Sequence, residues 1–197
     1  MTIATDFHTA RARLERELSP DSFGHALRTA ALARLLAVIH SVDPDRAELA
    51  GLLHDVGDQY SDEQLLTLAE RYGIPVDLTE ARIPRLLHSA VGAEVLRRDW
   101  GIDDDELLDA IAVHVTGSPI MGRLAKVLFL ADKLEPERDQ HYGGLGPIRE
   151  LATSDLDAAV LKLYAWRLTD LVGQGRRVDG QLIQARNALI ERMVAAG

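Results

Sequence analysis

Gly51-Leu52-Leu53-His54-Asp55-Val56-Gly57-Asp58 is the stretch on which the organisation of this chain depends. An apolar run leads into a histidine and an aspartate, and a glycine follows shortly after, a pattern typical of the buried end of a helix. Adjacent helical side chains point about 100° apart. His54 and Asp55 can therefore bind one metal ion only if the ion lies at the helix end and other helices supply further ligands.

The composition is that of an ordinary globular protein, with 47% hydrophobic and 27% charged residues among 197. A chain of this length buries a core without disulfides or a structural metal, so we expect one domain over residues 1–197. The net charge of −9 repels nucleic acid and anionic membranes, and neither is an expected partner. The absence of cysteine excludes thiolate metal sites and cysteine nucleophiles.

The N-terminal residues 1–8 have no apolar core of the signal-peptide type. The most hydrophobic run, residues 30–39, is interrupted by Arg34 and is well short of a membrane span. The sequence therefore predicts a cytoplasmic protein.

Helical start signals recur along the whole chain, and no window shows a sustained strand pattern of alternating residues. Proline or capping residues open most segments, as in Ser19-Pro20, Asp43-Pro44 and the capping box Ser61 to Gln64. We therefore expect an all-α bundle of about nine helices, with a glycine-rich connection at 142–147. The predicted helices cover residues 5–18, 19–38, 43–57, 61–73, 80–100, 103–114, 121–134, 154–173 and 181–196, with a disturbance of the fifth expected at Pro84 and with Ser118-Pro119 starting the seventh. Further caps are expected at Asp103 and Glu106, and at Ser154 and Asp157.

Four of the seven histidines lie at or near the ends of different predicted helices, and two aspartates follow apolar stretches. Imidazole together with carboxylate suits divalent ions such as iron, manganese or zinc. A mixed set of this kind also leaves open positions for water and phosphate oxygens, which indicates a hydrolytic metal site. The residues concerned are His25, His54, His88, His114, Asp55 and Asp132.

Each of these residues also has a purely structural interpretation. A lone histidine in a helical bundle is usually a satisfied core or surface residue, and we interpret His8, His40 and His141 in this way. Asp132 could belong to a solvated helical face. The apolar run 127–131 before it indicates depth instead, where an aspartate must be paired or bound to metal. The acidic run 103–106 is interpreted as charge at a helix N-terminus and not as a calcium loop.

The order of these residues resembles that of the HD-domain metal-dependent phosphohydrolases, whose defining feature is a His, His-Asp, Asp series. Within that group the chain is most similar to the YqeK family, the symmetrical diadenosine tetraphosphate hydrolases of bacteria. The local strings that carry the resemblance lie at 25–28, 51–55, 87–92, 112–117, 129–138 and 185–187.

This resemblance implies ferrous iron as the metal, with manganese or zinc as alternatives, in one or two ions. It implies cleavage of a dinucleoside polyphosphate, diadenosine tetraphosphate, into two ADP. The metal core would span about 20–140, and the helices within 154–196 would complete the nucleotide site. The implied ligands of the principal ion are His25, His54, Asp55 and Asp132.

The resemblance also implies roles on the open side of the metal. His88 and His114 would either bind a second metal or contact phosphate directly. Arg138 would bind phosphate, and the turn containing Gly175 and Arg176 would border the nucleotide. Relatives usually carry a lysine three residues after the HD aspartate, where this chain has Asp58, and Lys133 is a candidate replacement for that cation.

In the mechanism that follows from these roles, an activated water attacks a β-type phosphorus of the tetraphosphate, in line with an ADP leaving group. Asp55 binds metal and orients or deprotonates the water, while His88, His114, Lys133 and Arg138 stabilise charge on the phosphate oxygens. Two other functions stay open at this point. One is an HD-domain hydrolase of another nucleotide, and the other is a non-catalytic nucleotide-sensing module. The oligomeric state is also open, with a homodimer as one alternative.

Overall fold

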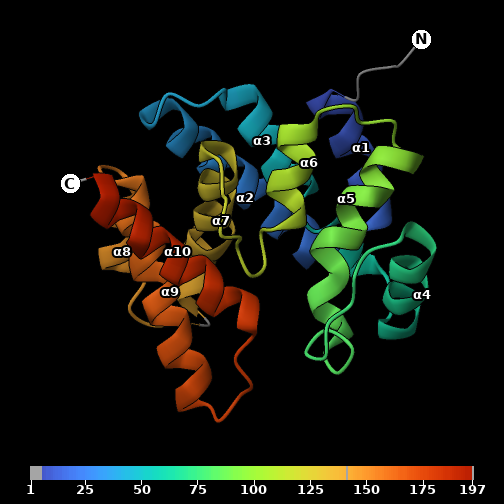
Figure 1. Cartoon of the computed structure of the whole chain (residues 1–197). Coiled ribbons are helices and arrows are strands. Elements are labelled where there is room, and N and C mark those ends of the chain that lie inside the picture. The colour runs from blue at the N-terminus through green and yellow to red at the C-terminus, as the bar shows by residue number, and fades with distance from the viewer. Residues whose placement is uncertain (1–5, 141, 197) are drawn as a thin grey trace.

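The computed structural model describes residues 6–140 and 142–196, and this part of the chain folds as helices without strands (Figure 1). The all-α prediction is confirmed, with ten α-helices in the described residues where about nine were expected. In chain order the elements are α1 (Phe7–Glu17), α2 (Pro20–Ile39), α3 (Pro44–Leu53), the 3-10 helix η1 (Val56–Gln59), α4 (Asp62–Tyr72), η2 (Pro84–Leu87), α5 (His88–Asp99), α6 (Asp105–Ala112), α7 (Arg123–Leu134), η3 (Pro136–Gln140), α8 (Gly146–Ala152), α9 (Leu156–Gly173) and α10 (Gly180–Ala196).

Side-chain caps start several helices where the sequence predicts them. The hydroxyl of Ser19 accepts a hydrogen bond from the backbone of Ser22, and the capping box of Ser61 and Gln64 is complete. Two other caps differ by one or two residues from the prediction. Asp104, not Asp103 or Glu106, caps α6. Asp155 caps α9 in place of Ser154 and Asp157.

Several helix boundaries differ from the prediction for physical reasons. The helix expected at 43–57 ends at Leu53, so that His54 and Asp55 lie just beyond α3 and not in its last turn. The helix expected at 80–100 begins only at His88, because Pro84 lacks the amide that a helix interior needs. The sixth helix ends at Ala112, and the seventh starts at Arg123. Both are shorter than the pattern suggested.

The short helix α8 lies in the segment expected to be a glycine-rich connection. It has seven residues, too few to be stable alone, and it is held by tertiary packing. Its buried side chains, Ile148 and Ala152, lie in the same core as α9, its main neighbour. Tertiary contacts thus form a helix that local propensity does not predict.

Helix α2 lies at the centre of the arrangement, packed against α3 and α7, while α8, α9 and α10 form a group on one side (Figure 1). By length and composition alone, α2 is apolar enough to cross a membrane. Its small residues Ala26, Ala30 and Ala33 are buried against the neighbouring helices. In this fold one face of α2 packs into the core, and the helix carries His25 to the pocket.

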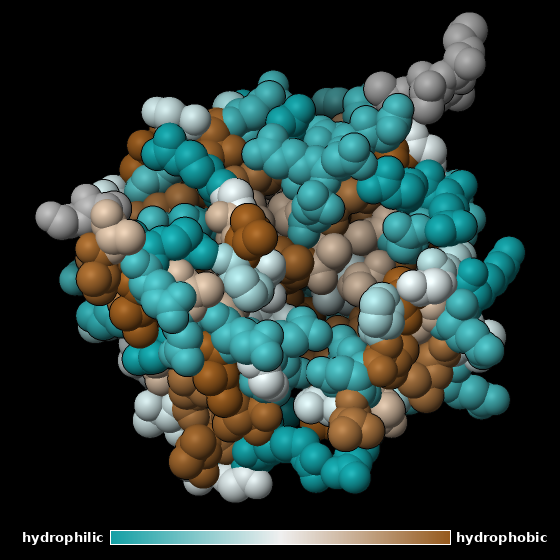
Figure 2. Space-filling model, in the orientation of Figure 1, coloured by the Kyte–Doolittle hydropathy of each residue, from teal (hydrophilic) through white to brown (hydrophobic). Residues whose placement is uncertain are grey.

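The surface is mixed in character. Figure 2 shows hydrophilic residues over much of one face, with hydrophobic residues gathered over the lower part of α9 and α10. Large apolar side chains that these two helices leave exposed include Val172, Ile183 and Val194. The C-terminal group of helices therefore carries more exposed apolar surface on this face than its surroundings.

Two glycines fix the position of the His54-Asp55 bend between its neighbours. A side chain at Gly51 would put its Cβ 2.7 Å from the Cα of Ala30, so α3 can pack on α2 only with glycine there. At Gly57 a Cβ would lie 2.0 Å from the carbonyl oxygen of His88, which starts α5. These close backbone contacts bring the bend against both α2 and α5.

Candidate metal centre and substrate pocket

A pocket of about 560 Å³ opens above the His54-Asp55 bend. Five of the six predicted histidines and aspartates line it, and the sixth, His54, is fully buried beneath them. Cations and aromatic rings make up most of the remaining wall. The lining residues are Ser22, His25, Asp55, Asp58, Arg85, His88, His114, Val115, Asp132, Lys133, Arg138, Tyr142, Trp166 and Arg167.

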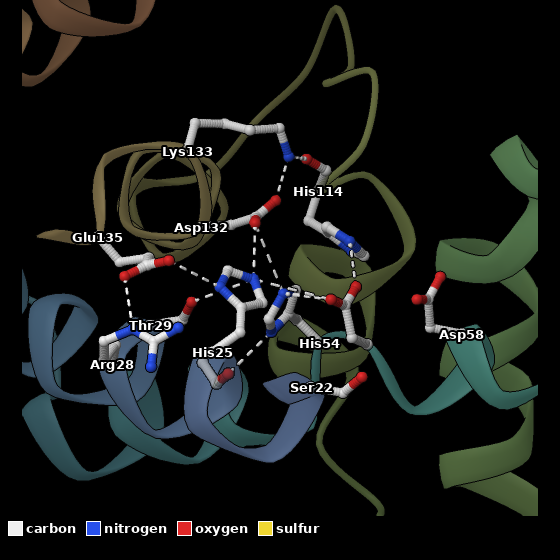
Figure 3. Close-up of polar contacts among 12 residues, drawn as sticks. Ser22, His25, Arg28, Thr29, His54, Asp58, His114, Asp132, Lys133 and Glu135 are labelled. Carbon is white, nitrogen blue, oxygen red and sulfur yellow. Dashed lines mark hydrogen bonds and ion pairs between the residues drawn. The ribbon is translucent and has the colours of Figure 1, made fainter. Parts of the chain in front are cut away.

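The ligand atoms expected from the sequence converge at the floor of this pocket (Figure 3). His25 Nε2 lies 3.1 Å from Asp132 Oδ1. His54 Nε2 lies 3.1 Å from Asp55 Oδ2 and 3.6 Å from Asp132 Oδ1. The four side chains come from α2, the bend after α3, and α7. Segments that are far apart in sequence therefore form one His/Asp cluster.

Three of the histidines are held by the same local device. The Nδ1–H of His54 donates to the carbonyl of Gly51 at 2.8 Å, and that of His114 donates to Ile111 at 2.8 Å. His88 Nδ1 lies 2.6 Å from the carbonyl of Arg85 and donates to it. Each acceptor is three residues earlier, near a helix end where carbonyls lack helical partners. All three rings are thereby fixed with Nε2 facing the cluster.

His25 cannot use this device because it lies inside α2, where the backbone carbonyls already bond within the helix. Its Nδ1–H instead donates to Glu135 Oε1 at 3.1 Å. Glu135 is 2% exposed and also accepts from Arg28 Nε at 2.8 Å. The Arg28 guanidinium offsets the burial of this carboxylate and lowers the Glu135 pKa. Glu135 therefore orients His25 as a buried carboxylate orients a metal-binding imidazole.

Asp55 contacts histidines with both of its carboxylate oxygens. Its Oδ2 faces His54 and, at 3.7 Å, His25 Nε2. Its Oδ1 lies 3.2 Å from His88 Nε2 and 3.3 Å from His114 Nε2. Each group offers a set of ligand atoms within 4.8 Å of one another. Asp55 thus offers one carboxylate oxygen to each of two pairs of histidines.

The donor set fits a divalent metal ion. His54 Nε2 is buried without a hydrogen-bond partner, an arrangement that costs free energy unless a cation or proton is bound there. Burial disfavours the His54 cation, but Asp55 and Asp132 outweigh burial and raise its pKa to about 10. Burial also works against the charged forms of Asp55 and Asp132, yet their neighbours hold both pKa values well below the usual range. A divalent ion would balance the same carboxylates and displace that proton.

His114 differs from His54 although both rings are buried. Burial, together with the facing rings of His54 and His88, lowers the His114 pKa to about 4. A neutral imidazole with its Nδ1–H bonded to a carbonyl leaves Nε2 free as a ligand. His88 Nε2 lies 3.2 Å away, within the same group of ligand atoms.

Lys133 and Arg138 lie beside Asp132 at the edge of the cluster. Lys133 Nζ pairs with the Asp132 carboxylate and donates to the carbonyl of His114 at 3.3 Å. Arg138 Nη2 donates to Asp132 Oδ1 at 2.7 Å and to His25 Nε2 at 3.0 Å. Both cations therefore contact the ligand cluster directly.

The turn predicted to border the nucleotide lies outside this pocket. Gly175 is exposed with a φ of 63°. Arg176 lines an adjoining hollow of about 70 Å³, which shares Val115 and Arg167 with the pocket. The structure thus places Arg176 next to the site and Gly175 at the surface.

The segment that carries the His/Asp cluster matches a known family. Residues 22–137, which include all six ligand candidates, match the HD domain family. The chain belongs to the HD domain family. The resemblance predicted from the motifs is thereby confirmed at the level of the superfamily.

Individual HD-domain relatives match over most of the chain. The symmetrical bis(5'-nucleosyl)-tetraphosphatase of Bacillus subtilis (strain 168) is 32% identical over 153 residues, which are 78% of this chain and 81% of that protein. The protein of the same name in Staphylococcus aureus (strain NCTC 8325 / PS 47) is 35% identical, over 89% of this chain and 90% of that one. The resemblance to the symmetrical hydrolases is confirmed by these relatives.

A solved HD-domain structure is also similar. The crystal structure of an HD superfamily hydrolase from Clostridium acetobutylicum, described as involved in NAD metabolism, has a TM-score of 0.90 and 30% identity to this chain. The match covers 96% of this chain and 99% of that one. The arrangement of helices is therefore common to both proteins.

The remaining histidines of this HD-domain protein lie away from the cluster or outside the described residues. His40 is buried and donates from Nε2 to the carbonyl of Ala152 at 2.7 Å, as a satisfied core residue does. His8 is exposed in α1. His141 lies outside the described residues.

Sequence reasoning missed several residues in and around the site. Glu135 follows Asp132 by three residues, a helical spacing that could have indicated a second inward carboxylate. Arg85 stands three residues before His88, and only the fold shows that it pairs with Asp58. Tyr142, Trp166, Ser22 and Arg167 also line the pocket and had no spacing signal.

Proposed function

We propose that this protein is a metal-dependent hydrolase that cleaves diadenosine tetraphosphate symmetrically into two ADP. The observation that carries this proposal is the convergence of four fixed imidazoles and two aspartates at the floor of a pocket with cations at its edge. The tetraphosphatase relatives, similar over most of both chains, supply the substrate class.

The residues present would hold one or two divalent ions. His25, His54, Asp55 and Asp132 would bind the principal ion, for which we propose ferrous iron with manganese or zinc as alternatives. His88 and His114, with the second oxygen of Asp55, would bind a second ion. Such ions, when bound, supply Lewis-acid polarisation of a phosphoryl oxygen and lower the pKa of coordinated water.

The protein groups would then position the reactants and neutralise charge. Asp55 keeps a pKa well below the usual carboxylate range, so it is a poor proton acceptor and acts by orienting water and ligands. Lys133 and Arg138 reach from α7 and η3 to the edge of the cluster, where they would bind phosphate oxygens as the substrate enters. His88 and His114 would lie on the open side of the cluster, where the phosphate groups of the substrate bind.

The walls farther from the metal suit a nucleoside. Tyr142 and Trp166 form an edge-to-face pair with ring centroids 5.5 Å apart, and both line the pocket. Trp166 Nε1 donates to the carbonyl of Gly143 at 3.0 Å, which fixes its ring. An aromatic surface of this kind stacks with a nucleobase. Arg176, in the adjoining hollow, would lie near the second nucleoside that a symmetrical dinucleotide requires.

The partner of this site is a small dinucleoside polyphosphate, and the acidic net charge argues against nucleic acid. We place the protein in the cytoplasm, a reducing compartment in which iron can stay ferrous. The oligomeric state is left open, with a homodimer as one alternative.

Product identity tests the proposal. Iron-loaded protein given diadenosine tetraphosphate should yield ADP alone. ATP with AMP would exclude symmetrical cleavage, and no turnover by protein shown to contain iron would refute the assignment. A panel of other nucleotides in the same assay separates this activity from that of a nucleotidase. Metal content without hydrolysis of any panel member would support a nucleotide-sensing module instead.

A further inference from the structure

The pocket wall formed by η1 and η2 carries an ion pair between Asp58 and Arg85. The Arg85 guanidinium pairs with the Asp58 carboxylate, and its Nη2 also donates to the Asp58 carbonyl at 2.9 Å. Its Nη1 donates to the carbonyl of Tyr60 at 3.1 Å. These contacts hold a residue that is 27 positions along the chain from its partner.

These contacts fix the guanidinium but leave two of its N–H groups available. Arginine has five N–H donors in a planar fork, and the contacts to Asp58 and Tyr60 engage three of them. The two others meet no acceptor among the residues that the structure describes. The Arg85 side chain is 44% exposed and lines the pocket. A cation with spare donors therefore stands at the pocket wall in one orientation.

Among the described residues, the guanidinium of Arg85 makes no contact with a proposed metal ligand, unlike the side-chain cations of Lys133 and Arg138. Lys133 and Arg138 both bind Asp132, so their positions are coupled to the ligand cluster. Arg85 binds Asp58, whose carboxylate lies on the side away from Lys133 (Figure 3) and 3.9 Å from His88 Nδ1. The backbone carbonyl of Arg85 accepts a hydrogen bond from His88 Nδ1, so the backbone of Arg85 lies next to a proposed ligand.

We propose that Arg85 binds a substrate phosphate on the η1 and η2 wall and that Asp58 is its anchor. The free Nε–H and the free Nη1–H can each donate to a phosphate oxygen, and an orientation fixed before binding reduces the entropy lost on binding. Asp58, an anion in a pocket for a polyanion, then supports binding by holding a cation from another segment. This proposal rests on the proposed function, because the ligand is the polyphosphate of that substrate.

The test compares Arg85→Met with Arg82→Met in the metal-loaded protein. Arg82 is an exposed cation of the same segment and does not line the pocket, so it controls for the loss of one charge. We expect Arg85→Met to raise KM for diadenosine tetraphosphate about 10- to 100-fold with kcat nearly unchanged. Arg82→Met should leave KM unchanged. Arg85→Lys should give an intermediate KM, because an ammonium keeps the charge without the fixed planar donors of the guanidinium.

Equal KM values for Arg85→Met and Arg82→Met, at equal metal content, would overturn the proposal. A fall in kcat or metal content with unchanged KM would also overturn it, since that result indicates a structural role through His88. If the wild-type protein makes no ADP, the proposed function fails, and calorimetric binding of pyrophosphate decides the role of Arg85. Loss of affinity in Arg85→Met but not in Arg82→Met supports phosphate binding, and equal affinity refutes it.

Discussion

The floor of the pocket and its wall at η1 and η2 are built in different ways. At the floor, His54, His88 and His114 each donate to a carbonyl three residues earlier, so short segments of sequence fix their rings. At the wall, the side chains of Asp58 and Arg85 hold each other through contacts between segments 27 residues apart.

This difference shows which parts of such a site can vary independently. A histidine with a local backbone acceptor keeps its orientation whatever the rest of the wall becomes, because carbonyls are present in every sequence. The orientation of a paired cation depends on both residues of the pair, so a substitution of one residue affects the other. His25 is intermediate, since it is a ligand candidate at the floor but depends on the distant Glu135.

Removing a ligand from the floor should have the largest effect. Asp132→Ala deletes the carboxylate that lies between His25 and His54. We expect loss of bound metal and a fall in hydrolysis greater than about 100-fold, the upper end for losing an outer partner of a ligand. Metal analysis and ADP formation measure the two effects. Asp109→Ala, an exposed carboxylate of α6, is the control. Full metal content in Asp132→Ala would remove Asp132 from the ligand set.

A smaller effect should follow from a substitution at Gly57 that pushes the His54-Asp55 bend away from α5. A Cβ at Gly57 would lie 2.0 Å from the carbonyl oxygen of His88, so Gly57→Ala must displace backbone. We expect a loss of unfolding free energy of about 1–3 kcal/mol or more, measured by urea denaturation. At Gly146, where a Cβ would meet no atom within 4 Å, alanine should be neutral or stabilise by up to ~1 kcal/mol. Equal stability of the two variants would contradict the tight contact.

The smallest effect should come from changing Glu135, which orients His25 at the floor of the pocket. Glu135→Ala removes the acceptor of His25 Nδ1 while leaving every proposed ligand in place. Metal affinity, measured by competition with a chelator, should fall about 10- to 100-fold. Glu137→Ala is the matched control, because Glu137 also pairs with Arg28 but is half exposed and does not touch His25. Unchanged affinity in Glu135→Ala would show that packing alone orients His25.

Much of the fold and of the candidate ligand set could be predicted from the sequence. The helices with strong caps lie where they are expected, and the six ligand candidates do converge in space. The errors have a common cause. Helix α8 depends on tertiary packing, and the start of α5 depends on Pro84. The pattern of apolar residues indicates neither feature.

The sequence by itself determined the order and type of the candidate ligands, because each histidine stands at a helix end or beside an apolar run that brings it inward. The tertiary structure decided which distant residues orient those ligands and which residues line the substrate pocket. Glu135 meets His25 across 110 residues, and Arg85 meets Asp58 across 27. Contacts between distant segments follow from helix packing, and the spacing of residues along the chain contains no record of them.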